Sequence, residues 1–187
     1  NLGNVEYHLG NYQQAIIYFE EAIQWLLHYN YQLGLIETYG MLALVYEKLE
    51  NYLECTKYFE LAIDISSNIE YTYSKVDTLI DYSLFLDRQG FGAKALDTLA
   101  EAYTLTSQKK MYAKSMEICK KIVAILEKSG DLVKSNYYYR LYFENEACLA
   151  PIKQENKARN LKMKMDLEHL EDEHKSILEQ SEVFRRR

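Results

Sequence analysis

Small, large apolar and turn-forming residues recur along this chain at a fixed interval of 40 positions. Within one unit Cys55, Phe59, Ala62 and Ile63 follow one another at steps of four, three and one, which is the spacing of a single helix face. Several residue classes sharing one period predict an internal repeat of helical units. The recurring sets are Ala15/Cys55/Ala95/Ser135, Phe19/Phe59/Leu99/Tyr139, Ala22/Ala62/Ala102/Tyr142, Tyr12/Tyr52/Gly92/Leu132 and the turn set Gly10/Glu50/Gly90/Gly130.

Two helices joined by a turn fill each unit of this repeat. Glycine supplies the positive φ that ends one helix before the next begins. Where Glu50 and Asn51 replace it, Asn51 is expected to take that conformation. We predict helices at about 1–9, 12–29, 33–49, 52–68, 70–89, 92–107, 110–129 and 132–148.

The segment after Pro151, the only proline, differs from the rest of the chain in its density of mixed charges. Proline fits the first turn of a helix, so a new helix is expected to start there. Apolar residues then recur at alternating steps of four and three, which predicts a coiled coil. At about 1.5 Å per residue the helix would reach on the order of 50 Å. Its seam comprises Met163, Leu167, Leu170, His174, Ile177, Ser181 and Phe184.

Two arrangements of residues 151–187 are open. In the first, the helix projects and pairs with its own copy in a parallel homodimer. In the second, it is an amphipathic cap that folds back over the last repeat. The expected domain organisation is therefore a repeat array over 1–148 and a connector helix over 151–187.

Composition and charge narrow the function classes. Residues 152–187 hold nine basic and eight acidic side chains and carry a charge of +1, so residues 1–151 carry −7 and give the chain its net charge of −6. An acidic array is a poor host for a phosphate backbone, which argues against direct nucleic-acid binding. The residues given show no signal-peptide pattern and no long apolar run, and the three cysteines are widely spaced. These features favour a cytoplasmic protein without membrane contact.

Candidate chemistry is sparse in the sequence. His169 and His174 are five positions apart, so they point to different faces of a helix and do not form a metal motif. Cys55 occupies a small-residue position of the repeat and is expected to be a packed core thiol. No phosphate loop or nucleophile motif occurs. We therefore predict a protein that is not itself an enzyme, with no metal, cofactor or catalytic residue.

The repeat resembles the tetratricopeptide repeat family. Leu2-Gly3, then Gly10-Asn11-Tyr12 with Ala15, Phe19 and Ala22, follow its pattern, and Leu42, Tyr46, Tyr52, Phe59 and Ala62 follow it again. The resemblance covers residues 1–145, although the period here is 40 residues and the usual period of the family is about 34. Asn1 falls inside the first helix, so the first of about four repeats is expected to be truncated. The resemblance implies an all-α fold, an α-solenoid of helix–turn–helix repeats. The long coiled-coil-like helix predicted from the four-and-three spacing would follow it.

In this family the first helix of each repeat lines a groove that binds a protein or peptide. Carried over by position, the groove residues are Asn4, Tyr7 and His8 in the first repeat, Glu37, Met41, Leu44 and Lys48 in the second, Asp77, Asp81, Leu84 and Arg88 in the third, and Glu117, Lys121 and Lys128 in the fourth. Their mixture suits a peptide with a basic residue and an apolar anchor.

The 40-residue period and the charged terminal helix also resemble bacterial signalling proteins in which a repeat array senses a ligand. A coiled-coil connector then feeds an output domain, often a diguanylate cyclase of the GGDEF family. Two other readings are open: a stand-alone scaffold or adaptor, and a regulator that binds a peptide pheromone.

Overall fold

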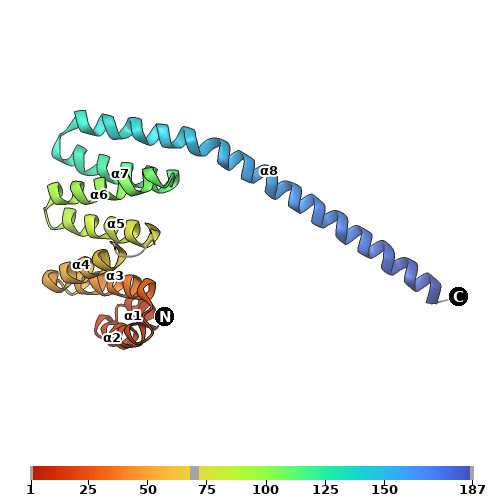
Figure 1. Ribbon diagram of the computed structural model, residues 1–187, viewed down its shortest axis with the longest axis horizontal. Helices are drawn as coiled ribbons and strands as arrows, with labels where there is room; N and C mark the ends of the chain where they lie inside the picture. The colour runs from red at the N-terminus through yellow and green to blue at the C-terminus, as the bar shows by residue number, and fades with distance from the viewer. Residues whose placement is uncertain (1, 68–71, 186–187) are drawn as a thin grey trace.

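The computed structural model describes residues 2–67 and 72–185, with side chains described as far as residue 170. Over these ranges the chain folds into α-helices without a β-strand (Figure 1). The helices are α1 (Leu2–Leu9), α2 (Tyr12–His28), α3 (Gln32–Lys48), α4 (Tyr52–Ser67), α5 (Thr72–Arg88), α6 (Gly92–Gln108), α7 (Tyr112–Ser129) and α8 (Leu132–Arg185).

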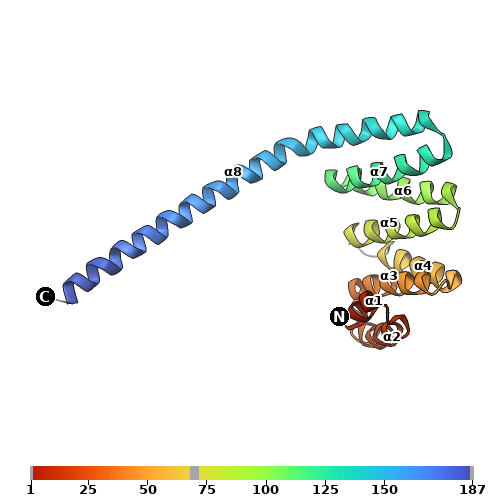
Figure 2. The same cartoon turned by 180° about the vertical axis from the view of Figure 1, so that it is seen from behind.

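Successive helices stack in antiparallel order into an array, and α8 extends away from its far end (Figures 1 and 2). Each helix packs mainly on its neighbours in the sequence, and α3 also contacts α5. The helix ends of α2 to α7 lie within two residues of the predicted ones. The predicted helix–turn–helix array is therefore confirmed.

The turns that the structure describes lie at multiples of 20 residues from one another, half the period of the repeat. In each described turn, a residue one or two positions after the helix has a positive φ. The next N–H bonds back to a carbonyl five residues earlier, as when Asn51 N donates to Tyr46 O at 2.9 Å. This is the Schellman arrangement, which satisfies carbonyls left open at a helix end. The positive-φ residues are Gly10, Asn30, Glu50, Gly90, Lys110 and Gly130.

The turn at Glu50 and Asn51 differs from the expectation. Glu50, not Asn51, takes the left-handed conformation, with φ of 57°. Asn51 instead precedes α4, and its Oδ1 accepts a hydrogen bond from Glu54 N at 3.4 Å. The hydrogen-bonded turn fixes which position must be left-handed, and Asn51 is better placed as an N-terminal cap.

The core of the array is built from the residues that share the 40-residue period. Ala15, Cys55 and Ala95 have no exposed surface, and neither do Phe19, Phe59 and Leu99. Small residues let the helix axes approach, and the large side chains fill the space between them. The fourth repeat departs from this rule, because Tyr139 is 42% exposed. In the described chain no further helix pair covers that side of α8.

Helix α8 runs without a break from Leu132 to Arg185 and contains Pro151 in its interior. The prediction of a new helix starting at Pro151 was therefore wrong. Proline removes one backbone hydrogen bond, here to the carbonyl of Ala147, and tends to bend a helix. Both residues are exposed, so water can bind the freed carbonyl. Figure 1 shows α8 changing direction as it leaves the array, so the fold-back arrangement is not adopted.

Candidate partner-binding face

The first helices of the repeats, α1, α3, α5 and α7, share one side of the array, which we call the first-helix face. All of the predicted groove residues lie on these helices, and none of them is fully buried. Eight are partly buried: Asn4, Tyr7, Met41, Leu44, Asp81, Leu84, Glu117 and Lys121. Six are exposed: His8, Glu37, Lys48, Asp77, Arg88 and Lys128. Such side chains are available to a partner, and their role in binding stays a prediction.

A pocket of about 310 Å³ opens on this face between α1, α3 and α5. It brings together six of the predicted groove residues: Asn4, Glu37, Met41, Leu44, Asp77 and Asp81. It also has four lining residues that the prediction missed: Ile36, Gly40, Ser74 and Thr78. Each missed residue lies beside a predicted one or one helical turn from it, so the three-to-four spacing along α3 and α5 could have found them.

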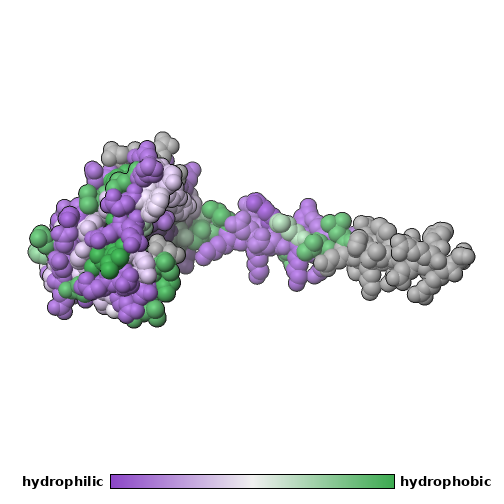
Figure 3. Space-filling view, turned by 90° about the horizontal axis from the view of Figure 1, so that it is seen from below, coloured by the Kyte–Doolittle hydropathy of each residue, from purple (hydrophilic) through white to green (hydrophobic). Residues whose placement is uncertain are grey.

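A second pocket, of about 460 Å³, adjoins the first and shares Asn4, Glu37 and Met41 with it. Its other wall comes from the end of α2, where Trp25 is 64% exposed. The Trp25 ring stacks on Tyr29, with centroids 6.2 Å apart. Seen from the end that holds the first repeat, the surface shows apolar patches separated by hydrophilic side chains (Figure 3). Apolar anchors with a polar surround are typical of binding surfaces.

The basic groove residues near the helix ends are engaged in ion pairs between successive repeats. Arg88 donates two hydrogen bonds to the Glu47 carboxylate, from Nε at 2.7 Å and from Nη2 at 2.9 Å. Lys128 contacts Asp87 at 3.4 Å. Both pairs join one first helix to the next, with partners 41 positions apart. Exposed pairs of this kind contribute little stability, but they leave Arg88 and Lys128 less available to a ligand.

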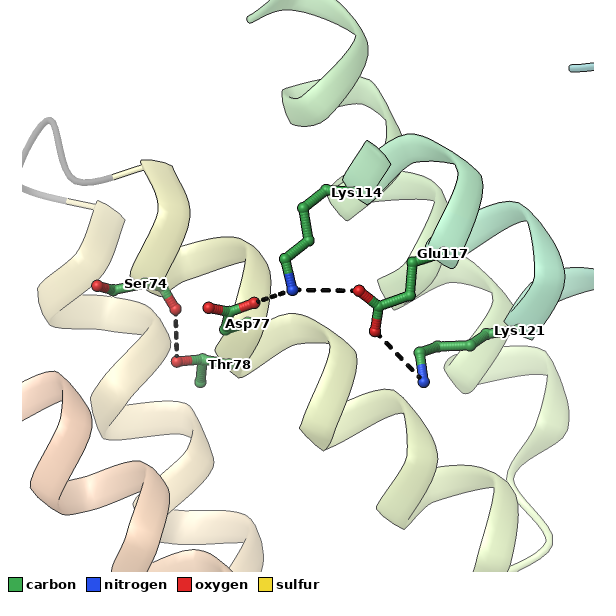
Figure 4. Close-up of polar contacts among 6 residues, drawn as sticks. All are labelled: Ser74, Asp77, Thr78, Lys114, Glu117 and Lys121. Atoms are coloured by element: carbon green, nitrogen blue, oxygen red, sulfur yellow. Dashed lines mark hydrogen bonds and ion pairs between the residues drawn. The ribbon is translucent and has the colours of Figure 1, made fainter. Parts of the chain in front are cut away.

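A second set of ion pairs bridges α5 and α7 (Figure 4). Lys114 lies between Asp77, at 2.8 Å, and Glu117, at 3.1 Å. Glu117 in turn contacts Lys121 at 3.6 Å. Lys114 was not predicted from the sequence, and it neutralises the acidic Asp77 at the edge of the smaller pocket.

The cysteines and acidic clusters show no catalytic arrangement in the described part of the chain. Burial raises the pKa of the Cys55 thiol to about 12 and that of Cys119 to about 11. Thiols of this kind are protonated and unreactive at neutral pH, and the prediction of Cys55 as a core residue is confirmed. Among the described residues no set of three metal-ligating side chains gathers, and no helix combines the length and apolar character needed to span a bilayer.

The connector helix presents the first part of its predicted seam to solvent. Met163, Leu167 and Leu170 are between 57% and 64% exposed. The remaining seam residues, His174, Ile177, Ser181 and Phe184, are on α8, but their side chains lie outside the described ones. The pairing of two copies along this seam stays a prediction.

Comparisons with known proteins agree with the repeat architecture. Residues 1–68 match the family model of the tetratricopeptide repeat. The crystal structure of BtubC (BKLC) from P. vanneervenii is similar, with a TM-score of 0.62 at 16% identity over 72% of this chain and 55% of that one. This chain thus spans just over half the length of BtubC. A search of curated protein sequences gave no match.

Two other solved structures are similar over much of the chain. The apo form of RapI has a TM-score of 0.46 at 15% identity, over 77% of this chain and 65% of that one. Pseudomonas aeruginosa pilF has a TM-score of 0.44 at 19% identity, over 77% and 73%. The family match covers the first repeats, and the same helix-pair fold continues from them through α8. Residues 1–68 therefore match the tetratricopeptide repeat family, and the rest of the array continues the same helix-pair fold.

Proposed function

We propose that this chain is a cytoplasmic sensory module of a bacterial signalling protein. It binds a protein or peptide segment on its first-helix face and passes that event along α8 to an output domain, such as a diguanylate cyclase. The observation that supports this most directly is the pocket between α1, α3 and α5. It gathers residues from three successive first helices, so one occupant contacts several repeats at once.

A ligand that spans several repeats can change the shape of the array. In a repeat protein each unit contacts only its neighbours, so small changes in packing add up along the stack. An occupant that binds one curvature more tightly shifts the population toward it. Because α8 packs along α7 and then leaves the array, a change at that last helix pair would tilt the projecting helix.

Peptide binding can be tested without knowing the natural ligand. Peptides selected on the full chain from a random displayed library should lose affinity by about tenfold or more when Met41 is changed to lysine. Met41 lines both pockets, and a charge there removes the apolar anchor. Affinity would be measured by fluorescence anisotropy, with circular dichroism to verify the fold.

The matched control is Leu53→Lys. Leu53 is an exposed apolar residue on α4, a second helix of a repeat, away from the first-helix face. It should bind the selected peptides as the unmodified chain does. Equal binding by Met41→Lys and the unmodified chain would rule out this face as the binding site.

We also propose that the chain forms a parallel homodimer through α8. The exposed Met163, Leu167 and Leu170 follow the four-and-three spacing of a coiled-coil seam. Pairing would bury these side chains and place two output domains next to each other. A tilt of α8 at the array could then alter how the two copies pair.

The dimer prediction is tested by light scattering on the full chain. It should have the mass of a dimer at concentrations on the order of tens of micromolar, and Leu167→Glu/Leu170→Glu should reduce it to a monomer, because charges in the seam repel. The control, Leu161→Glu/Met165→Glu, changes two residues that are equally exposed but off the seam, and it should remain dimeric. A monomeric unmodified chain at that concentration would exclude the homodimer.

A further inference from the structure

The pocket between α1, α3 and α5 contains hydrogen-bond acceptors that no donor satisfies. The Oδ1 atom of Asn4 is buried and has no hydrogen-bond partner. Glu37 and Asp81 also line this pocket, and neither makes a hydrogen bond or ion pair with any other described residue. A buried acceptor without a partner costs free energy, so the pocket is suited to a ligand that brings donors.

The basic side chains nearest to this pocket are engaged with other partners. Lys114 is shared by Asp77 and Glu117, and Lys121 contacts Glu117. Arg88 forms its two-nitrogen contact with Glu47. Of the three acids that line the pocket, only Asp77 therefore makes a direct ion pair, while Lys121, Lys114 and Arg88 act on Asp81 at longer range. Burial and the neighbouring Asp77 raise the pKa of Asp81, so a further positive charge placed between it and Glu37 would stabilise its charged form.

Gly40 gives a second and independent indication that the pocket is built for a ligand. It lies in the interior of α3, where glycine costs about 1 kcal/mol relative to alanine. Its φ is not positive, and a Cβ atom placed on it would meet nothing within 4 Å. Neither backbone conformation nor helix packing requires a glycine here. Its effect is to keep open the space between Glu37 and the apolar Met41 and Leu44.

We propose that this pocket receives a lysine or arginine side chain of the bound peptide. The charged end lies between Glu37 and Asp81, next to Asn4. Its aliphatic stem lies on Ile36, Met41 and Leu44, as long basic side chains commonly do. Charge-assisted hydrogen bonds of this type are among the strongest in proteins. The inference rests on the proposed peptide binding and names the residue class that the pocket selects.

The test uses pools of acetylated and amidated nonapeptides in which the central residue is fixed and the others are random. Pools fixed as lysine or arginine should bind the full chain at least about tenfold more tightly than pools fixed as glutamine or glutamate. The double variant Glu37→Gln/Asp81→Asn should abolish this preference. Glu20→Gln/Glu21→Gln removes the same charge from exposed positions of α2 and should keep the preference, which separates the pocket from general attraction to an acidic array.

A further variant separates binding from stability. Gly40→Leu should lose the preference for basic pools, because the side chain fills the pocket, while its thermal unfolding midpoint stays equal or rises. If basic and glutamine pools bind equally to the unmodified chain, or if Gly40→Leu keeps the preference, the basic-residue pocket is excluded and peptide binding stands. If no pool binds at all, both the pocket and the proposed function are overturned.

Discussion

Replacing Phe59 with alanine should lower the free energy of unfolding by about 3–5 kcal/mol, which is typical of a large side chain lost from a core. Phe59 on α4 has no exposed surface and contacts the rings of Tyr82 and Phe85, with centroids 5.3 and 6.0 Å away. It therefore holds the second repeat to the third. Since each repeat is stabilised by its neighbours, the cavity weakens both. Urea unfolding followed by circular dichroism would measure the change.

The matched control for Phe59 is Tyr139→Ala. Tyr139 occupies the same position of the repeat two units later, but it is partly exposed, and its hydroxyl donates to Glu127 at 3.2 Å. Its replacement should cost less than about 1 kcal/mol. Equal losses for the two variants would mean that the fourth repeat is covered in solution by another helix or another chain.

Replacing Ala102 with aspartate should destabilise the array by more than about 4 kcal/mol, because it buries an unpaired carboxylate as well as extra volume. Ala102 on α6 has no exposed surface and belongs to the main core cluster. Burial would raise the pKa of the new carboxyl group above its value in the unfolded chain. The loss in free energy of unfolding relative to the unmodified chain should therefore grow as the pH rises from the unfolded-state pKa to the folded-state pKa. It should shrink as the pH falls through the same interval. Urea unfolding of both chains at several pH values would test this.

Ala93→Asp is the control for Ala102. Ala93 is exposed in the first turn of the same helix, where a negative charge interacts favourably with the helix dipole. Its effect should stay within about 0.5 kcal/mol. A stable Ala102→Asp variant would show that the core around α6 can open enough to admit water at this position.

The helices and the core were predictable from the sequence because both depend on local spacing. The step of three or four along a helix determines which residues share a face, and the 40-residue period marks the same core positions in each unit. Phe19, Phe59 and Leu99 were thus recognisable as core residues, and all three have no exposed surface. Six of the ten residues that line the pocket were also predicted, from the family resemblance carried over by position, among them Glu37, Met41 and Leu44 on α3.

The features that the sequence did not predict depend on what surrounds a residue in the fold rather than on its spacing along the chain. The period alone could not show that Tyr139 lacks a covering helix, or that Glu50 takes the left-handed position of its turn. Proline is normally a helix breaker, and only the exposed setting of α8 lets Pro151 stay inside a continuous helix.

The sequence by itself determined that this protein is a stack of helix pairs with a long terminal helix, because periodicity encodes which side chains face the core. The tertiary structure decided which charges on the first-helix face are engaged and which are available. Arg88 forms an ion pair with Glu47, and Lys114 forms one with Asp77, in each case between two different helices. Glu37, Asp81 and Asn4 Oδ1 are left without such partners among the described residues. The distances between side chains on different helices depend on how the helices pack, and no spacing along one chain specifies them.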